Sequence, residues 1–303
     1  MNGPRTSLPD LTALGLRWDD SGRAALTGAL LRLSQDLDRA LCLLAEIWHA
    51  EPEQHPATIA ADQLEHLGYL NSFPHQATFA VALDDSPENL DGFRAEPVET
   101  DGAIRACGWA PVRSVLTPAA CYHLYIGHRG EQLTEPAYLT TRNTCFRRER
   151  HYEPLRRQWS FDMREIVCVA GESETEGFAE QGRAVVSDFA DGLGLELTWE
   201  PATDPFFRPG TDPRYLLQRI HPVKFEAVCD GLAVGSVNRH FEHFGELMDI
   251  DYAGAPAHST CVAFGLERWL SVIVQTHGPK VRNWPDPVAA ADRAAARANV
   301  VAR

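Results

Sequence analysis

The sequence predicts an α+β fold, in which an antiparallel β-sheet is flanked by helices and preceded by an N-terminal helical extension. Three observations support this prediction. Short apolar runs of strand composition follow one another without regularly alternating helices, which favours an antiparallel sheet over a parallel one. The turn sequence Cys229-Asp230-Gly231 joins two of these runs as a hairpin. A long amphipathic pattern near the N-terminus predicts the helix of the extension.

The extension is predicted from its leucines. From Leu26 to Leu44 they recur every three or four positions, so they lie on one stripe of a helix over residues 22–49. Such a stripe is typical of core or dimer packing, and docking of a partner is the alternative. Residues 51–56 contain two prolines and end the helix. We therefore divide the chain into an extension, residues 1–56, and one larger α+β domain, residues 57–303.

The larger domain is expected to hold the following elements. Strands are predicted at Thr78–Leu83, Val112–Leu116, Tyr122–Ile126, Thr144–Arg148, Phe161–Ala170, Leu195–Trp199, Val223–Val228 and Leu232–Asn238. Helices are predicted at Thr58–Leu70, from a capping box at Ser173–Glu176 to about Gly194, at Phe264–Gln275, and in the tail from Asp286. Residues 84–105 are polar and are expected to form a loop.

Composition excludes several classes of function. The chain has 28 Lys and Arg against 42 Asp and Glu, a net charge of -14, which argues against an extended polyanionic partner such as tRNA or DNA. No segment approaches the roughly 18 apolar residues that a membrane helix needs, and no signal-peptide core follows Met1–Arg5. We therefore expect a cytoplasmic protein without membrane contact. The 7 cysteines lack the spacing of a disulfide framework, and most are expected to be small buried side chains.

Three sequence motifs carry the chemistry. The common Gly-rich nucleotide-binding and Ser hydrolase motifs are absent. Instead, Thr144–Glu149 (TCFRRE) is followed by a polar loop, then Arg157–Glu165 (RQWSFDMRE), and much later Phe264–Arg268 (FGLER). Alone, the FRRE run is typical of a solvated edge strand. Together the three segments resemble motifs 2 and 3 of class II aminoacyl-tRNA synthetases, and the segment around Pro74 resembles motif 1, the dimer-forming element. This resemblance implies a class II synthetase-like catalytic domain and a homodimer.

Within that class the likeness is to the seryl-tRNA synthetase core, over roughly residues 58–280. The resemblance implies that Arg147 and Arg268 are catalytic: Arg147 would hold the α-phosphate of ATP, and Arg268 would reach the γ-phosphate. It also implies that Glu149 accepts a hydrogen bond from the adenine amino group. Phe161 and Arg268 would pack on opposite faces of the adenine.

A possible metal site comes from a departure from the common bacterial seryl enzyme. Where that enzyme has Thr-x-Glu, this chain has Ala119-Ala120-Cys121. Together with Glu165 and Cys261, Cys121 resembles the ligand set of the archaeal-type, zinc-dependent seryl enzyme. Two thiolates and a carboxylate with one open position suit catalytic Zn²⁺, and the alternative is that both cysteines are simply buried thiols. His240, His243 and His258 have no complete ligand spacing and are expected to make polar surface or loop contacts.

The acceptor is predicted from what the chain lacks. Only about 56 residues precede the core, and one helix cannot form the two-stranded tRNA-binding arm of the synthetase. With the acidic charge, this argues against tRNA. The combination resembles the amino acid:[carrier protein] ligases, truncated homologues of the archaeal-type seryl core. Segments that share this resemblance are Ala202–Phe207, Lys224–Glu226, Ser236–His240 and Ala257–Trp269.

This last resemblance implies an activity. Such enzymes activate glycine or alanine with ATP and pass the aminoacyl group to the phosphopantetheine thiol of a holo carrier protein. Glu165 and Asn238 would contact the amino acid, and Glu226 and Ser236 would lie on the ATP and Mg²⁺ side. Ala233 stands where the synthetase usually has a magnesium-side Glu, which leaves the Mg²⁺ ligands open. The alternatives are an arm-less seryl-tRNA synthetase-like enzyme and a non-catalytic regulatory paralogue.

Overall fold

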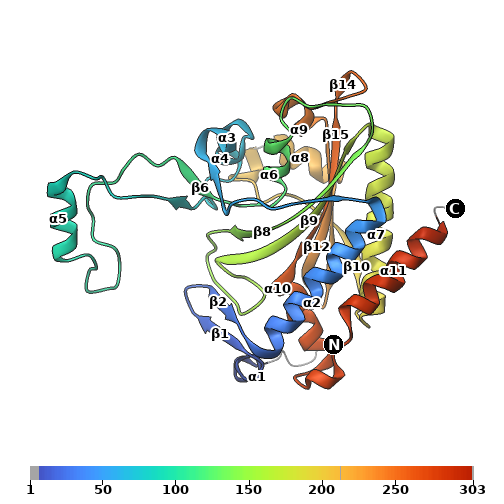
Figure 1. Cartoon of the computed structure of the whole chain (residues 1–303), viewed down its shortest axis with the longest axis horizontal. Helices are drawn as coiled ribbons and strands as arrows, with labels where there is room; N and C mark the ends of the chain where they lie inside the picture. The colour runs from blue at the N-terminus through green and yellow to red at the C-terminus, as the bar shows by residue number, and fades with distance from the viewer. Residues whose placement is uncertain (1–6, 212, 302–303) are drawn as a thin grey trace.

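A seven-stranded sheet organises the molecule (Figure 1). The computed structural model describes residues 7–211 and 213–301, so Met1–Arg5, used above to assess a signal peptide, lie outside the described residues. The strand order is β10 (Thr198–Ala202), β11 (Lys224–Cys229), β12 (Leu232–Phe241), β15 (His258–Gly265), β9 (Ser160–Ala170), β8 (Ala137–Phe146) and β3 (Glu51–Glu53). All neighbours are antiparallel except β3 and β8. The predicted α+β class is therefore confirmed.

Four helices cover one face of this sheet: α2 (Gly28–Ala45), α7 (Glu172–Gly192), α10 (Leu266–His277) and α11 (Pro287–Val301). Side chains alternate along β9, so Ile166 and Cys168 face these helices while Glu165 and Val167 face the opposite side. The leucine stripe of α2 is buried in this helical layer, which confirms its role in core packing. The described residues before residue 57 thus share one core with the rest of the chain.

Smaller elements lie on the opposite face. They are β4 (Thr58–Ala60), α3 (Ala61–His66), α4 (Tyr69–Ser72), β6 (Ser114–Leu116), α6 (Tyr122–Gly127), β7 (Gln132–Leu133), α9 (His243–Met248), β13 (Asp251–Tyr252) and β14 (Ala255–Pro256). Apart from residues 77–113, the described residues also form α1 (Leu8–Ala13), β1 (Leu16–Asp19), β2 (Arg23–Leu26), α8 (Pro213–Ile220) and three short 3₁₀ turns. Within the described residues, no helix combines the length and apolar character needed to cross a bilayer.

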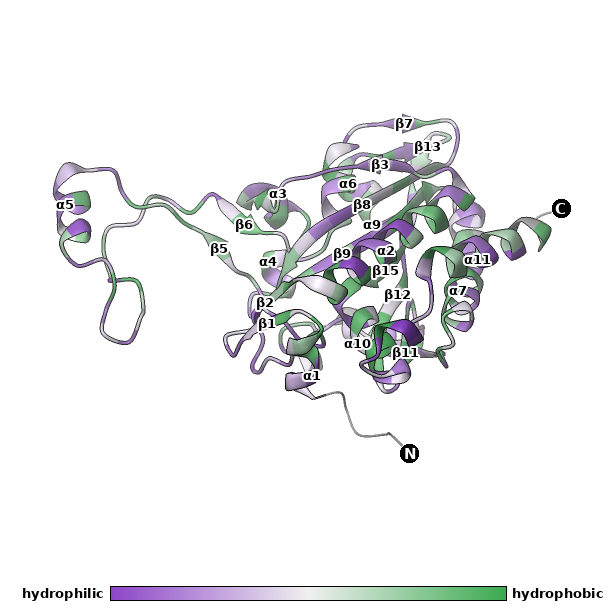
Figure 2. Ribbon diagram, turned by 60° about the horizontal axis from the view of Figure 1, so that its bottom comes forward, coloured by the Kyte–Doolittle hydropathy of each residue, from purple (hydrophilic) through white to green (hydrophobic). Residues whose placement is uncertain are grey.

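An arm formed by residues 77–113 extends away from the body and contains β5 (Phe79–Ala80) and α5 (Pro87–Ala95) (Figures 1 and 2). None of the residues of α5 is buried. Seven of the large hydrophobic side chains that are exposed in this structure belong to the arm: Phe79, Val81, Leu90, Val98, Ile104, Trp109 and Val112. The loop predicted over residues 84–105 is therefore wrong in one respect, because it contains a helix.

Several predicted elements differ from the structure. Residues 122–126, predicted as a strand, form α6, because the chain turns into a helix at Cys121 and buries three successive side chains, His123, Leu124 and Tyr125. The helix predicted over 58–70 is divided, since Gly68 has a φ of 71° and separates α3 from α4.

Other differences concern where elements begin. The first long helix starts at Gly28 because residues 23–26 pair with β1 as a hairpin. The capping box at Ser173 is wrong: the N-cap is Gly171 and makes no side-chain cap. The helix predicted from Phe264 starts at Leu266, because residues 258–265 are the strand β15. Strand β8 begins at Ala137, well before the predicted Thr144.

An ion-pair clamp joins the edge strand β3 to α6. His128, the C-cap of α6, has Nε2 2.7 Å from Glu53 Oε1 and Nδ1 2.9 Å from Glu131 Oε2. Burial alone would lower the pKa of His128, but these two hydrogen bonds raise it above its ordinary value. The clamp is therefore strongest when His128 is protonated.

This clamp predicts a pH-dependent contribution to stability. Because the pKa of His128 is raised in the folded state, the contribution is complete below the ordinary pKa of about 6.5 and is lost as the pH rises through the folded pKa. We expect His128→Gln to lower the free energy of unfolding by about 1 kcal/mol at pH 6 and by less at pH 8. Urea unfolding of both proteins at the two pH values measures the difference. An equal cost at pH 6 and pH 8 would show that the ion pairs are not the cause.

Candidate active site

A cavity of about 490 Å³ lies against the sheet face opposite the four helices. Every side chain that the sequence assigned to the site lines it: Cys121, Arg147, Glu149, Phe161, Glu165, Glu226, Ser236, Asn238, Cys261 and Arg268. The sheet brings several of them together through its register. Asn238 of β12 pairs with Cys261 of β15. Glu165 of β9 pairs with Ala263, which follows Cys261 by two residues on β15 and so has its side chain on the same face. These side chains therefore point into the same space.

The metal trio, Cys121, Glu165 and Cys261, is assembled from three elements. The ligand atoms of the three side chains all lie within 4.8 Å of one another, and all three residues are buried. Backbone N–H groups of Ala120 and Cys121 donate to Glu165 Oε1 at 3.0 and 3.2 Å, which fixes the carboxylate. Within the part of the chain that the structure describes, no other three His, Cys, Asp or Glu residues meet in this way.

The electrostatics of the metal trio favour a bound cation. Burial, reinforced by the neighbouring Cys261, raises the pKa of Glu165 to about 7. The hydrogen bond between the two thiols raises the pKa of Cys121 and lowers that of Cys261. Three acidic groups in one buried space cannot all be ionised without a compensating charge. Two thiolates and a carboxylate are ligands that Zn²⁺ accepts, so the residues present fit this metal.

The arginine cluster, Arg147, Arg157 and Arg268, lines the same cavity. Arg268 donates from Nε to the carbonyl of Arg156 at 3.0 Å and from Nη1 to that of Ala233 at 2.9 Å. Burial, together with the charges of Arg147 and Arg157, lowers the pKa of Arg268 to about 10. Guanidinium groups that line one cavity repel one another, and a polyphosphate would relieve that repulsion.

The predicted adenine residues lie beside this cluster. The guanidinium of Arg147 lies 5.1 Å from the ring centroid of Phe161, so an arginine covers one face of the ring on which a base was expected to stack. Glu149 accepts a hydrogen bond from Arg157 Nη1 at 2.7 Å. A base that stacks on Phe161 would therefore use the ring face opposite the Arg147 guanidinium.

The two residues predicted on the magnesium side, Glu226 and Ser236, are directly opposite each other on β11 and β12. Lys224 Nζ lies 3.9 Å from Glu226 Oε1, and Asn238 Nδ2 donates to Ser236 Oγ at 3.1 Å. The backbone carbonyl of Ala233 accepts a hydrogen bond from Arg268. Glu226 thus contributes a carboxylate to this part of the cavity wall.

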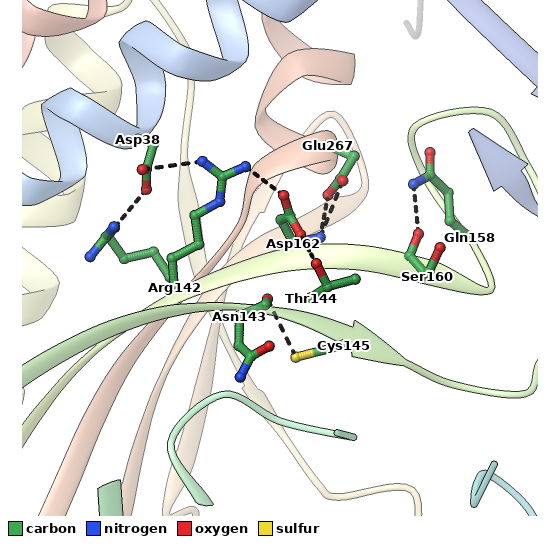
Figure 3. A network of polar contacts seen from close by, with 10 residues as sticks. Asp38, Arg142, Asn143, Thr144, Cys145, Gln158, Ser160, Asp162 and Glu267 are labelled. Atoms are coloured by element: carbon green, nitrogen blue, oxygen red, sulfur yellow. Dashed lines mark hydrogen bonds and ion pairs between the residues drawn. The ribbon is translucent and has the colours of Figure 1, made fainter. Parts of the chain in front are cut away.

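A second polar network, which the sequence did not predict, joins the long strands to helices α2 and α10 (Figure 3). Asp162 accepts from Thr144 Oγ1 at 2.7 Å and pairs with Arg142, which also donates to Asp38 of α2 at 3.2 Å. The backbone N–H of Asp162 donates to both carboxylate oxygens of Glu267 at 3.1 Å. Burial, with the charge of Asp162, raises the pKa of Glu267 to about 8. The sequence offered one signal for this network, because Glu267 lies within the third motif, Phe264–Arg268.

The histidines only partly follow their prediction. His258 pairs with Glu242 at 3.0 Å, which is the polar contact expected. The prediction is wrong for His240, which is half-buried on β12 and lines the cavity. His243 is exposed, as expected of a surface residue, and borders the same cavity. His240 lies with Nε2 3.9 Å from Cys261 Sγ, next to the metal trio.

Comparisons with known proteins identify relatives of this chain. No protein-family model matches the chain. The sequence is 34% identical over 248 residues to amino acid–[acyl-carrier-protein] ligase 2 of Bradyrhizobium diazoefficiens, covering 78% of this chain and 73% of that protein. It is 26% identical over 251 residues to the type-2 serine–tRNA ligase of Methanothermobacter thermautotrophicus, covering 76% of this chain and 48% of that protein. The chain thus spans about half the length of the serine–tRNA ligase.

A solved structure gives the fold. The seryl-tRNA synthetase of M. kandleri, crystallised with A. aeolicus tRNASec, superposes with a TM-score of 0.76 at 20% identity, over 96% of this chain and 60% of that one. The fold is therefore that of the class II aminoacyl-tRNA synthetases, as the motifs predicted. The identity to the Bradyrhizobium ligase, over most of both chains, decides the family. The chain belongs to the family of amino acid–[acyl-carrier-protein] ligases.

Proposed function

We propose that the chain activates a small amino acid, glycine or alanine, with ATP and transfers it to the phosphopantetheine thiol of a holo carrier protein. The observation that carries this proposal is that one cavity contains both the metal trio and the arginine cluster. A site for an amine and a site for a polyphosphate within one cavity suit adenylation of an amino acid. The names of the Bradyrhizobium relatives support a carrier protein as acceptor.

The metal trio would bind the amino acid. Cys121, Glu165 and Cys261 would hold zinc, which would supply a Lewis acid for the substrate amine. Asn238 extends this site, because its Nδ2 donates to Cys261 Sγ at 3.2 Å while its buried Oδ1 has no hydrogen-bond partner among the described residues. That oxygen can accept an N–H of the substrate amine. Compounds without a free α-amine would bind poorly.

The arginine cluster would bind ATP. Arg147 would stabilise the charge on the α-phosphate while the substrate carboxylate forms the new O–P bond and pyrophosphate leaves. Arg268 would bind the γ-phosphate, and Phe161 with Glu149 would bind the adenine. Mg²⁺ supplies charge neutralisation to the phosphates, and Glu226 with Ser236 would hold it. In the second step the carrier thiol forms the thioester as AMP leaves, so no cysteine of this chain is acylated.

Pyrophosphate exchange with each of the twenty amino acids, followed by transfer assays, tests the proposal. We expect exchange with glycine or alanine, label on holo carrier protein that hydroxylamine removes, and no label on apo carrier protein. Total tRNA should be tested as a second acceptor, because the chain is also similar to serine–tRNA ligases. Substantial serylation of tRNA would overturn the assignment of the acceptor, and no exchange with any amino acid would overturn the activity.

We also propose a homodimer, in which the arm packs on a second copy of the chain. The arm begins directly after the Pro74 segment, which resembles the dimer-forming motif 1, and its exposed apolar side chains are costly to leave in water. We expect light scattering to give twice the 33.6 kDa of one chain.

A double variant, Phe79→Asp with Ile104→Asp, tests this interface. The two side chains are 53% and 55% exposed in one chain, so charging them leaves its core intact, and we expect at least about tenfold weaker dimerisation. Val300→Asp, at a 75% exposed position on α11, is the matched control and should dimerise normally. A double variant that dimerises like the control would place the interface elsewhere.

A further inference from the structure

We propose that His240 is a positioning residue of the metal trio: it holds the Cys261 side chain in the orientation that points its sulfur at Cys121 and Glu165. The inference rests on the proposed use of zinc by this family member. It concerns a histidine that its sequence spacing did not identify as part of any site. Three independent features of the structure support it.

The first feature is a strained β-bulge. Strand β12 pairs residue for residue with β15 from Gly235↔Phe264 to Arg239↔Thr260, and the register then shifts, so that Phe241 pairs with Ser259 and His240 pairs with no residue of β15. Phe241 has a φ of 51°, a left-handed conformation that is costly for an aromatic residue. Bulges of this kind re-aim a side chain, often beside active sites. Here the bulge is at the residue that faces the metal trio.

The second feature is how the His240 ring is held. Its Nδ1 lies 3.2 Å from Tyr125 Oη and 3.3 Å from Ser259 Oγ. The ring also makes edge-on contact with Phe244, with centroids 4.9 Å apart and planes at 73°. Tyr125 belongs to α6, Ser259 to β15 and Phe244 to α9. Contacts from three elements therefore fix the orientation of the His240 imidazole. A side chain that only filled space would not need both hydroxyl contacts.

The third feature is what the ring faces. A hydroxyl that donates to Nδ1 leaves the proton on Nε2, which lies 3.9 Å from Cys261 Sγ. Asn238 Nδ2 donates to the same sulfur at 3.2 Å. Two donors from β12 therefore converge on Cys261. Donors that surround a ligand in this way orient it, and their loss typically weakens metal binding 10- to 100-fold.

Metal affinity measures this role without depending on activity. We expect His240→Ala to raise the dissociation constant for Zn²⁺ about 10- to 100-fold in competition with a chromophoric chelator. The charge-transfer band of the Co²⁺-substituted protein should also shift, because the environment of the Cys261 sulfur changes. His240→Gln, whose amide N–H can occupy the position of Nε2–H, should restore most of the affinity. His277→Ala removes a histidine whose Nε2 instead lies 2.9 Å from the Leu193 carbonyl, and should bind zinc like the wild type.

A second variant keeps the test valid if His240→Ala does not fold. Tyr125→Phe combined with Ser259→Ala keeps the imidazole and removes both hydroxyl groups that orient it, and we expect several-fold weaker zinc binding. The proposal would be overturned if the variants that fold bind zinc within twofold of the wild-type affinity and show an unchanged Co²⁺ spectrum. Tight zinc binding in the wild type without pyrophosphate exchange would instead refute the proposed function and leave the role of His240 standing.

Discussion

We expect Cys121→Ser to abolish zinc binding and to lower amino acid-dependent pyrophosphate exchange on the order of a thousandfold, equivalent to about 4 kcal/mol. We expect this large effect because Cys121 is buried and its sulfur lies within 4.8 Å of the ligand atoms of Glu165 and Cys261. A serine hydroxyl is a poor zinc ligand, and the site would lose its hold on the substrate amine. Metal analysis and exchange kinetics measure the two losses on the same preparation.

Cys229→Ser is the control for this variant. Cys229 is also buried, on β11, but packs in the helical layer rather than in the cavity. The Cys229→Ser protein should bind zinc and catalyse pyrophosphate exchange like the wild type, even if its melting temperature falls. A Cys121→Ser protein that folds, lacks zinc and still exchanges at the wild-type rate would mean that the cavity does not use the metal trio for activation.

Arg147→Ala produces the second large effect. We expect kcat for exchange to fall about 10²- to 10³-fold, because a charged donor to the α-phosphate is worth most when the O–P bond is forming. Arg147→Lys should restore little of this, since a single ammonium cannot replace the planar guanidinium that lies over Phe161. Steady-state kinetics with varied ATP separate kcat from KM.

Arg183→Ala is a suitable control for this experiment. The Arg183 guanidinium also lies over an aromatic ring, that of Phe225 at 5.0 Å, but lines a different, smaller cavity. It should leave exchange nearly unchanged. If Arg147→Ala raised only the KM for ATP and left kcat intact, Arg147 would contribute to ground-state binding and not to the transition state.

Much of the site was predictable because its residues lie within motifs that resemble those of a known family. Residues 161–170 were predicted as a mostly apolar strand, and the two-residue period of any strand places Glu165 and Phe161 on one face and Ile166 on the other. The metal trio was predictable only through the resemblance to a family. Its three residues come from distant segments, and no local pattern relates their spacing.

Other features depend on tertiary contacts that a single sequence does not display. Residues 122–126 alternate in a way that suits a strand, and the burial of His123, Leu124 and Tyr125 together selects the helix α6. The bulge at His240 depends on how Phe241 pairs with Ser259 on another strand. The spacing of the histidines along the chain therefore gave the wrong expectation for His240.

Zinc content and exchange activity, measured on one preparation of the full chain before and after chelation, test the central claim most directly. We expect about one zinc per chain, exchange with glycine or alanine that declines in proportion as zinc is removed, and recovery when zinc is returned. Undiminished exchange by protein stripped of zinc would contradict the claim that the metal trio binds the amino acid.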